Sequence, residues 1–333
     1  MSEASNGSTG EMAGKVPVTL LTGYLGAGKT TLLNRILTEN HGKKYAVIVN
    51  EFGEEGIDNE LVIDADEEIF EMNNGCICCT VRGDLIRILG GLLKRADQLD
   101  GILIETTGLA DPSPVIQTFF VDDDLRDSLA LDAIVTMVDA KHFLQTVDLE
   151  HECEEQVAFA DIILLNKTDL VTDDEHQAVE KKIRSLNQFA VIHKTEKASV
   201  DLVEVLAKGS FDLKRLIEIE PGFMEEDPED HDHDDSIVSV SLTSDKPVLP
   251  DKFSSWMRTF VQDRGVDLLR TKGILALDGH EQRYVFQGVH MVMDSDWGKS
   301  WSPEEKRQSK LVFIGRNLDA AELESAFSAC VSQ

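Results

Sequence analysis

The sequence predicts an α/β protein whose N-terminal part is a doubly wound, mainly parallel sheet and whose C-terminal part is a smaller α+β domain. Amphipathic stretches of helix length alternate with short apolar runs at residues 18–21, 45–49, 69–72, 100–105, 133–138 and 161–165. This alternation is typical of parallel strands joined by crossover helices. After residue 236 two helix-like stretches accompany strand-like runs at 237–242, 268–277, 283–293 and 311–314. That order indicates an antiparallel sheet backed by helices.

Composition divides the chain into four parts. Residues 1–15 are polar and rich in glycine and serine, which predicts a flexible tail. Residues 218–235 hold ten acidic residues, two histidines and no lysine or arginine, so they cannot bury a core and predict an acidic linker. The sheet domain is therefore expected at 16–217 and the smaller domain at 236–333, and 333 residues are enough for both.

The net charge and the cysteine content narrow the class of protein. The formal charge of −30 argues against a nucleic-acid binder, whose footprint is basic. An acidic surface is compatible with handling metal cations, although it more often only keeps a protein in solution. We expect no membrane partner, because no apolar run reaches the roughly 20 residues of a membrane helix. Three of the five cysteines are bunched and the start of the chain lacks the apolar core of a secretory signal, so a reducing, cytoplasmic location is expected.

A glycine-rich turn follows the first apolar run. Gly23 is separated by four residues from Gly28-Lys29-Thr30, and an amphipathic helix follows. Strand, glycine-rich turn and helix in this order predict a P-loop, in which backbone N–H groups surround a phosphate. Lys29 is expected to reach the β- and γ-phosphates, and the Thr30 hydroxyl to bind Mg²⁺. The residues of this stretch predicted to bind nucleotide are Gly23, Gly26, Ala27, Gly28, Lys29, Thr30 and Thr31.

The strand at residues 100–105 ends in an acid and is followed by Thr106, Thr107 and Gly108. This is the Walker B position, where the carboxylate of Glu105 can hold Mg²⁺ directly or through water. The N–H of Gly108 is in a position to sense the γ-phosphate. We therefore expect Lys29, Thr30 and Glu105 to be the catalytic residues, acting by positioning and charge neutralisation. No residue can be assigned from the sequence as the group that orients the attacking water.

The strand at residues 161–165 runs into Asn166-Lys167-Thr168-Asp169. The carboxylate of Asp169 can accept two hydrogen bonds from guanine, through N1–H and the exocyclic amine, whereas adenine lacks this pair of donors. At a strand end downstream of a P-loop, this motif predicts that Asn166, Lys167 and Asp169 bind the base of GTP. It argues against a P-loop kinase or ATPase, which is the rival enzyme class.

Cys76, Cys78 and Cys79 lie within four consecutive residues between these motifs. Three thiolates in one tight loop can share a soft or borderline cation such as Zn²⁺. A redox pair and plain packing are the alternatives. The candidates for a fourth ligand are Glu51, Glu54 and Asp58 in the loop after the second strand. The pair His231 and His233 in the acidic linker is as compatible with weak metal binding as with a solvated linker.

These motifs together resemble the CobW-type P-loop GTPases, also called zinc-regulated GTPase metalloprotein activators. The resemblance covers residues 17–329, and the Cys-x-Cys-Cys element between the P-loop and Walker B is its most specific mark. It implies slow GTP hydrolysis with Mg²⁺, binding of Zn²⁺ or a similar metal, and delivery of that metal to a client metalloprotein. Two other functions remain open: a GTP-dependent zinc or redox sensor without metal transfer, and a cobalt-handling protein linked to cobalamin synthesis. A homodimer is also possible on the sequence alone.

Overall fold

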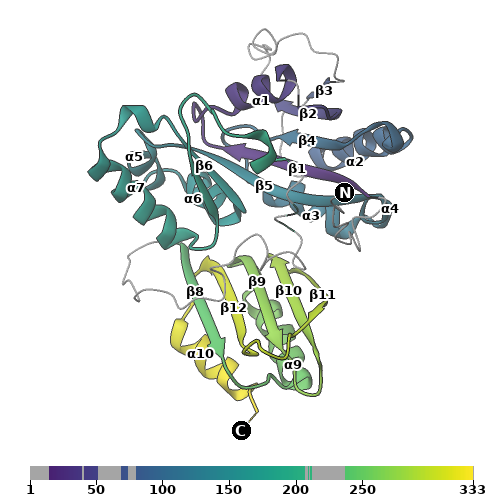
Figure 1. Cartoon of the computed structure of the whole chain (residues 1–333), viewed down its shortest axis with the longest axis vertical. Helices are drawn as coiled ribbons and strands as arrows, with labels where there is room; N and C mark the ends of the chain where they lie inside the picture. Colours follow the sequence, from purple (N-terminus) through teal and green to yellow (C-terminus); the bar gives the residue numbers. More distant parts are fainter. Residues whose placement is uncertain are drawn as a thin grey trace, which may run out of the picture.

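The computed structural model describes residues 15–39, 41–51, 69–73, 80–206, 209, 211 and 237–332. These residues form two domains, an α/β domain and a smaller α+β domain that packs beside it (Figure 1). The expected tail apart from its last residue, Lys15, the expected acidic linker with its two histidines, and the cysteine cluster lie outside the described residues.

The sheet of the first domain confirms the predicted doubly wound architecture. Its seven strands lie in the order β3-β2-β4-β1-β5-β6-β7, and every described pair is parallel. The strands are β1 (Val16–Gly23), β2 (Tyr45–Glu51), β3 (Ile69–Asn73), β4 (Gly101–Glu105), β5 (Leu129–Asp139), β6 (Ile162–Asn166) and β7 (Val191–Lys194). Because β1 lies between β4 and β5, the loop after it opens at the switch point where open α/β sheets bind their ligands.

Helices cover both faces of this sheet. The α-helices of the domain are α1 (Lys29–Thr38), α2 (Thr80–Leu93), α3 (Ser113–Val121), α4 (Asp123–Ser128), α5 (Phe143–Val147), α6 (His151–Phe159) and α7 (Asp173–Leu186). Short 3₁₀ turns add η2 (Ala96–Gln98), η3 (Thr168–Leu170) and η4 (Leu202–Glu204). Strand β1 is buried on both sides, with Leu20 in the core shared with α2, α3, α6 and α7 and Leu21 in the core shared with α1. Continuous burial of this kind explains why the strand sequence is mostly apolar.

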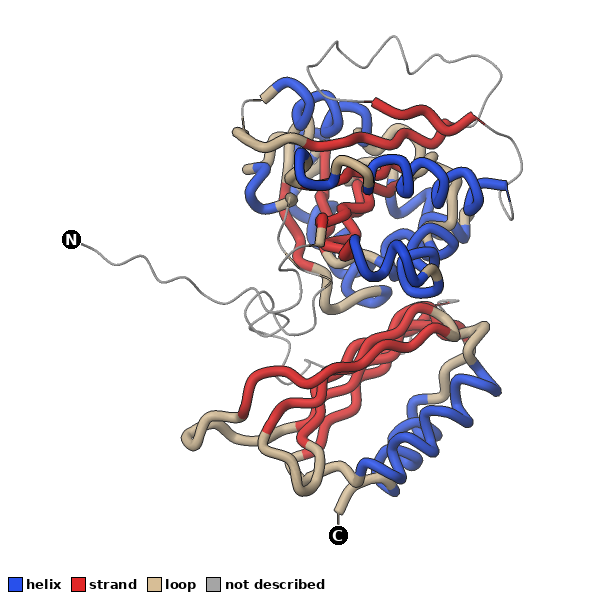
Figure 2. Tube along the Cα trace, turned by 90° about the vertical axis from the view of Figure 1, so that its right-hand side faces the viewer, coloured by secondary structure: helices blue, strands red, loops and turns tan. Residues whose placement is uncertain are grey.

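The second domain is an antiparallel sheet with two helices on one face, as predicted. Its elements are β8 (Ile237–Ser244), α9 (Pro250–Arg264), β9 (Leu268–Ala276), β10 (Gln282–Val289), β11 (Val292–Ser300), β12 (Ser309–Arg316) and α10 (Ala320–Ala329), with strand order β11-β10-β9-β12-β8. Figure 2 shows the helices on the side of the sheet that faces away from the first domain. The opposite face, which includes Leu269, Val312 and Ile314, belongs to the same apolar core as the first domain.

A buried ion cluster also joins the two domains. Asp161 at the start of β6 is fully buried and accepts from the backbone N–H of Ile134 at 2.9 Å. The same carboxylate pairs with Arg270 and Lys272 of β9, each at 2.9 Å. Both cations are buried, and the guanidinium of Arg270 also lies 4.2 Å from the ring centre of Phe211. Removing one partner from buried charges that are paired across the domains in this way is costly, so the pairs favour one orientation of the second domain on the first.

Two details of the secondary structure differ from the sequence prediction. The single strand expected at residues 283–293 is wrong, because β10 ends at Val289 and β11 begins at Val292. The turn between them places His290 at φ 52°, in the left-handed region that glycine, asparagine and aspartate usually mark in a sequence. The sequence predicted alternating strands and helices but gave no bounds for the four helices between β4 and β6, because each of them has nine residues or fewer.

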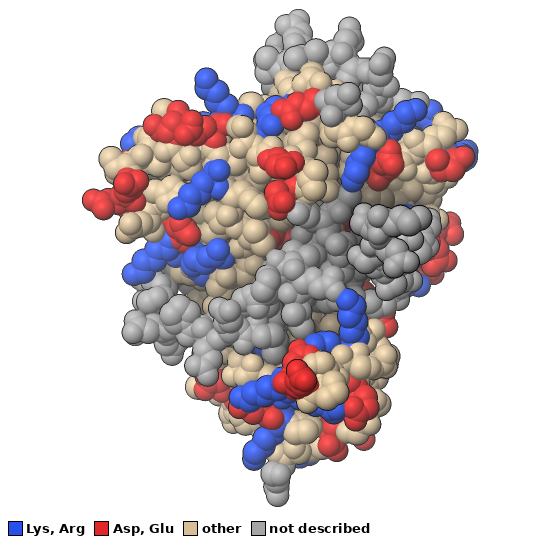
Figure 3. All heavy atoms as spheres, in the orientation of Figure 1, with Lys and Arg blue, Asp and Glu red and all other residues tan. Residues whose placement is uncertain are grey.

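Charge on the visible surface is mixed. Figure 3 shows lysine and arginine side chains interspersed with aspartate and glutamate over this face of both domains. Among the described residues, no helix combines the length and the apolarity that crossing a membrane requires.

Candidate nucleotide-binding site

The P-loop takes the backbone shape that its glycines predict. Gly23, Gly26 and Gly28 have φ values of 138°, 75° and 114°. A Cβ on Gly23 would lie 2.4 Å from the carbonyl oxygen of Met137, and a Cβ on Gly28 would lie 2.5 Å from Nδ2 of Asn166. Two of these glycines are therefore required both by the backbone angle and by the close approach of a neighbouring strand end.

Lys29 begins helix α1 and is buried. Its Nζ donates to the carbonyl oxygen of Gly23 at 2.7 Å and lies 3.3 Å from that of Tyr24. The ammonium group therefore lies inside the loop, where P-loop proteins bind the β- and γ-phosphates. Thr30 and Thr31 follow in the first turn of α1, whose N–H groups and dipole favour an anion.

The Walker B strand lies beside the P-loop strand. Glu105 is the register partner of Leu21 and is buried, and the next residue, Thr106, donates its N–H to the carbonyl oxygen of Leu21 at 2.9 Å. A Cβ on Gly108 would lie 2.7 Å from the backbone nitrogen of Leu25, so this glycine touches the P-loop itself. The P-loop and the Gly108 turn are thus in direct contact, as a shared γ-phosphate site requires.

Asn166 connects the base-binding motif to the P-loop. Its Nδ2 donates to the carbonyl oxygen of Ala27 at 3.0 Å, and its Oδ1 accepts from Thr195 Oγ1 at 3.1 Å and from Ala198 N–H at 2.9 Å. Asp169 lies in η3 with an exposed side chain. The carboxylate is therefore accessible to a base.

Residues Thr195 to Ala198 belong to the site, and the sequence analysis missed them. They follow β7 at the same edge of the sheet, and Lys197 and Ala198 have φ values of 52° and 56°. In the sequence these residues are a short polar stretch that ends in an alanine, directly after a strand. Stretches of this kind are too common to predict a binding site.

Asp139 at the end of β5 is a second residue that sequence reasoning left without a role. It accepts from Lys167 Nζ at 2.7 Å, from His142 Nδ1 at 2.9 Å and from the Lys141 N–H at 2.9 Å. Burial alone would raise the pKa of Asp139, but these hydrogen bonds outweigh it and lower the pKa below its ordinary value. A stable carboxylate here holds the side chain of Lys167 beside the P-loop.

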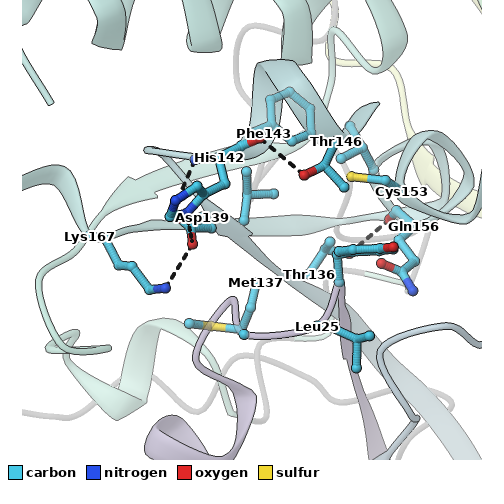
Figure 4. A pocket seen from close by; sticks show the side chains of 14 residues that line it. Leu25, Thr136, Met137, Asp139, His142, Phe143, Thr146, Cys153, Gln156 and Lys167 are labelled. Atoms are coloured by element: carbon cyan, nitrogen blue, oxygen red, sulfur yellow. Dashed lines mark hydrogen bonds and ion pairs between the residues drawn. The ribbon is translucent and has the colours of Figure 1, made fainter. Parts of the chain in front are cut away.

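A cavity of about 320 Å³ opens between the P-loop and helices α5 and α6. Figure 4 shows Lys167 and Asp139 at one end and Cys153 and Gln156 at the other, with Leu25 below. Burial, with a contribution from Glu154 and Glu150, raises the pKa of Cys153 to about 12. Cys153 is thus a packed thiol rather than a reactive one.

The residues present fit a magnesium-bound nucleoside triphosphate. The cradle of glycines leaves room for phosphate, and Glu105 brings a carboxylate to its edge. The hydroxyls of Thr22, Thr106 and Thr107 are buried and have no hydrogen-bond partner within the described part of the chain. Polar groups of this kind are normally hydrogen-bonded, so these three hydroxyls are available to a ligand or its water.

The predicted metal ligands cannot be placed. Cys76, Cys78 and Cys79, together with Glu54 and Asp58, lie outside the described residues, and only the backbone of Glu51 is described. Within the described residues, no three histidine, cysteine, aspartate or glutamate side chains gather closely enough to hold a metal ion.

Comparisons with known proteins identify the family of each domain. Residues 17–194 match the family described as CobW/HypB/UreG, nucleotide-binding domain, and residues 237–331 match the cobalamin synthesis protein cobW C-terminal domain. The chain is 38% identical over 321 residues to the zinc chaperone YjiA of Escherichia coli, covering 94% of this chain and 98% of that one. It is 32% identical to the zinc-regulated GTPase metalloprotein activator 1 of Schizosaccharomyces pombe, covering 91% and 83%.

A crystal structure of Zn(II)-bound YjiA GTPase from E. coli covers 96% of this chain and 99% of its own, with a TM-score of 0.79 and 33% identity. The match includes both domains, so the likeness is not limited to the P-loop. The chain therefore belongs to the CobW family of P-loop GTPases, with the family's nucleotide-binding domain followed by its C-terminal domain.

Proposed function

We propose that this protein is a GTP-hydrolysing metallochaperone that binds Zn²⁺ through Cys76, Cys78 and Cys79 and transfers it to a client metalloprotein. The observation that carries the proposal is the register of two neighbouring strand ends. Glu51, the last residue of β2, is the register partner of Asn73, the last residue of β3. The three cysteines follow Asn73 within six residues in the sequence, and the strand that precedes them ends beside Glu51 at the edge that holds the P-loop.

The nucleotide half of the proposal assigns roles to residues of the described site. Lys29 and the N–H groups of the P-loop bind the β- and γ-phosphates, and Thr30 and Glu105 hold Mg²⁺. When bound, Mg²⁺ neutralises charge that develops on the phosphates. Gly108 senses the γ-phosphate. Asn166, Lys167 and Asp169 select guanine, with Asp139, Thr195 and Ala198 fixing the geometry of that motif.

The metal half rests on ligand chemistry and on the relatives. Three thiolates and a carboxylate such as Glu51 form a four-ligand set that suits Zn²⁺. Relatives are named zinc chaperones and zinc-regulated GTPase metalloprotein activators. Because thiolates bind the metal, binding releases protons and weakens in acid.

Total zinc content is a poor readout for this proposal. One solved relative is described as a Zn(II)-bound triple mutant of YjiA GTPase in which one glutamate and two cysteines are replaced by alanine. In that protein, zinc is thus present without those side chains. A readout specific for thiolate ligands is needed, such as the ultraviolet charge-transfer band of Co²⁺ bound by cysteine.

The test replaces Cys76, Cys78 and Cys79 by serine and titrates Co²⁺ and then Zn²⁺ with GTP present. We expect the charge-transfer band to disappear while GTP binding stays within about threefold of wild type. Cys330→Ser is the matched control, because Cys330 is a buried thiol in the other domain and its loss should leave the band intact. A band that survives the triple change would overturn the metal site. Zinc transfer from the wild-type GTP form to an apo client zinc enzyme separates a chaperone from a sensor.

A further inference from the structure

Gln156 lies in helix α6 with only 1% of its surface exposed. Its side-chain Nε2 donates to the carbonyl oxygens of Gly108 at 3.1 Å and of Ala110 at 3.2 Å. Its own carbonyl oxygen accepts from Thr136 Oγ1 of β5 at 2.9 Å. Both hydrogens of the amide therefore hold the backbone of the turn that follows the Walker B strand.

This turn has little freedom of its own. The N–H of Ala110 donates to the carbonyl oxygen of Thr107 at 3.1 Å, which closes the turn around Gly108. On its other side Gly108 is in contact with Leu25 of the P-loop. A rotation of the peptides at Gly108 would break a hydrogen bond to Gln156 or press against Leu25.

The remaining polar atom of Gln156 argues that the amide is not kept for stability alone. Its Oε1 is buried and has no hydrogen-bond partner among the described residues. Leaving a buried acceptor in this state costs stability. Gln156 also lines the cavity beside the P-loop, opposite Lys167 (Figure 4).

We propose that Gln156 is a positioning residue for GTP hydrolysis, which clamps the Gly108–Ala110 turn in the geometry that receives the γ-phosphate. The proposal rests on the assignment of Gly108 under the proposed function. Because GDP has no γ-phosphate, loss of the clamp weakens binding of GTP and slows its hydrolysis but leaves binding of GDP almost unchanged. A purely structural residue would affect both nucleotides alike.

The experiment compares Gln156→Glu and Gln156→Met with wild type, in buffer that contains Mg²⁺ but no zinc. The first variant keeps the shape and loses the donors, and the second fills the volume with an apolar chain. Dissociation constants are measured for GDP and for the slowly hydrolysed analogue GTPγS, and kcat and KM for GTP. Two neutral hydrogen bonds correspond to about a tenfold effect. We expect GTPγS affinity and kcat each to fall by about tenfold or more, with GDP affinity within about threefold.

Glu155→Gln is the matched control, because its side chain leaves the same helix and pairs with Arg316 of the second domain instead. It should keep the ratio of GTPγS to GDP affinity. If Gln156→Glu does not fold, the nucleotide affinities and kcat of Gln156→Met alone test the proposal. A retained ratio and kcat, or an equal loss for both nucleotides, would overturn the proposal. Because the buffer contains no zinc, the results for the Gln156 variants do not depend on the cysteine site. If the cysteines proved not to bind zinc, the proposal for Gln156 would still stand.

Discussion

The side-chain amide of Asn166 donates a hydrogen bond of 3.0 Å to the carbonyl oxygen of Ala27 and thereby ties the base-binding motif to the P-loop. The same side chain accepts from Thr195 and Ala198, so one buried residue sets three segments of the site relative to one another. The segments predicted to bind the phosphates and the base are therefore connected by hydrogen bonds within the protein itself.

Gly28→Ala should disrupt this connection. The new Cβ would lie 2.5 Å from Nδ2 of Asn166 at a backbone φ of 114°, which non-glycine residues rarely adopt. We expect a loss of stability of about 1–3 kcal/mol and at least a tenfold loss of GTP affinity. Gly90→Ala is the control, because Gly90 lies in α2 with open space around it and should gain up to about 1 kcal/mol. Melting temperature and nucleotide titration measure both effects, and normal GTP binding by Gly28→Ala would contradict the described loop.

Asp169→Asn should reduce the preference for GTP over ATP. The variant loses the charged acceptor for two guanine donors, and hydrogen bonds to charged groups are worth about 1.5–3 kcal/mol. This corresponds to a fall in preference of roughly 10- to 100-fold, measured by competition between the two nucleotides. Asp174→Asn, on the exposed first turn of α7, should leave the preference unchanged. An unaltered preference in Asp169→Asn would refute the base assignment.

Sequence reasoning worked best where one residue type has a narrow chemical use. The P-loop glycines, Lys29 and Asn166 could be assigned because backbone angle, charge and hydrogen bonding leave few substitutes. No role was predicted for Asp139 or Gln156, because both act through neighbours that are distant in sequence. A single aspartate or glutamine forms no spacing pattern that a sequence motif could match. The turn at His290 was missed because residues 289–292 contain no glycine, asparagine, aspartate or proline, which are the residues that usually mark a hairpin turn in a sequence.

Asp161→Asn should loosen the junction of the two domains. Removing one partner of a buried ion pair costs roughly 3–5 kcal/mol, and Asp161 pairs with both Arg270 and Lys272. All three tryptophans lie in the second domain, so their fluorescence during urea unfolding reports on that domain while circular dichroism reports on the whole chain. The control Asp245→Asn removes an exposed partner of Lys306 and should unfold almost as wild type. Equal midpoints of urea unfolding for Asp161→Asn and Asp245→Asn would argue that the buried ion cluster does not stabilise the protein.

The junction should also weaken in mild acid because of His290. Burial against Phe159 lowers the pKa of His290 below 6.5, and the charge of Arg316 adds to this, while Asp111 and a hydrogen bond with Val266 oppose it. The unfolded chain thus binds the proton more tightly, and stability falls as pH decreases through and below 6.5.

His290→Asn keeps a side chain that tolerates the left-handed backbone and removes the titration. We expect a smaller difference in melting temperature between pH 7 and pH 5 than in wild type. His151→Asn, at an exposed position, should keep the wild-type difference. A pH profile of His290→Asn identical to that of wild type would rule out this contribution.

The central proposal, a metallochaperone that uses GTP, requires the zinc affinity of the cysteine site to differ between the GTP-bound and GDP-bound states, and one pair of titrations tests this directly. The affinity of the cysteine site for Zn²⁺ is measured by competition with a chelator, once with Mg²⁺ and GTPγS and once with Mg²⁺ and GDP. We predict that the two zinc affinities differ, and that zinc changes the ratio of GTPγS to GDP affinity by the same factor, as reciprocity demands. Zinc affinities that are equal in both nucleotide states would contradict the account.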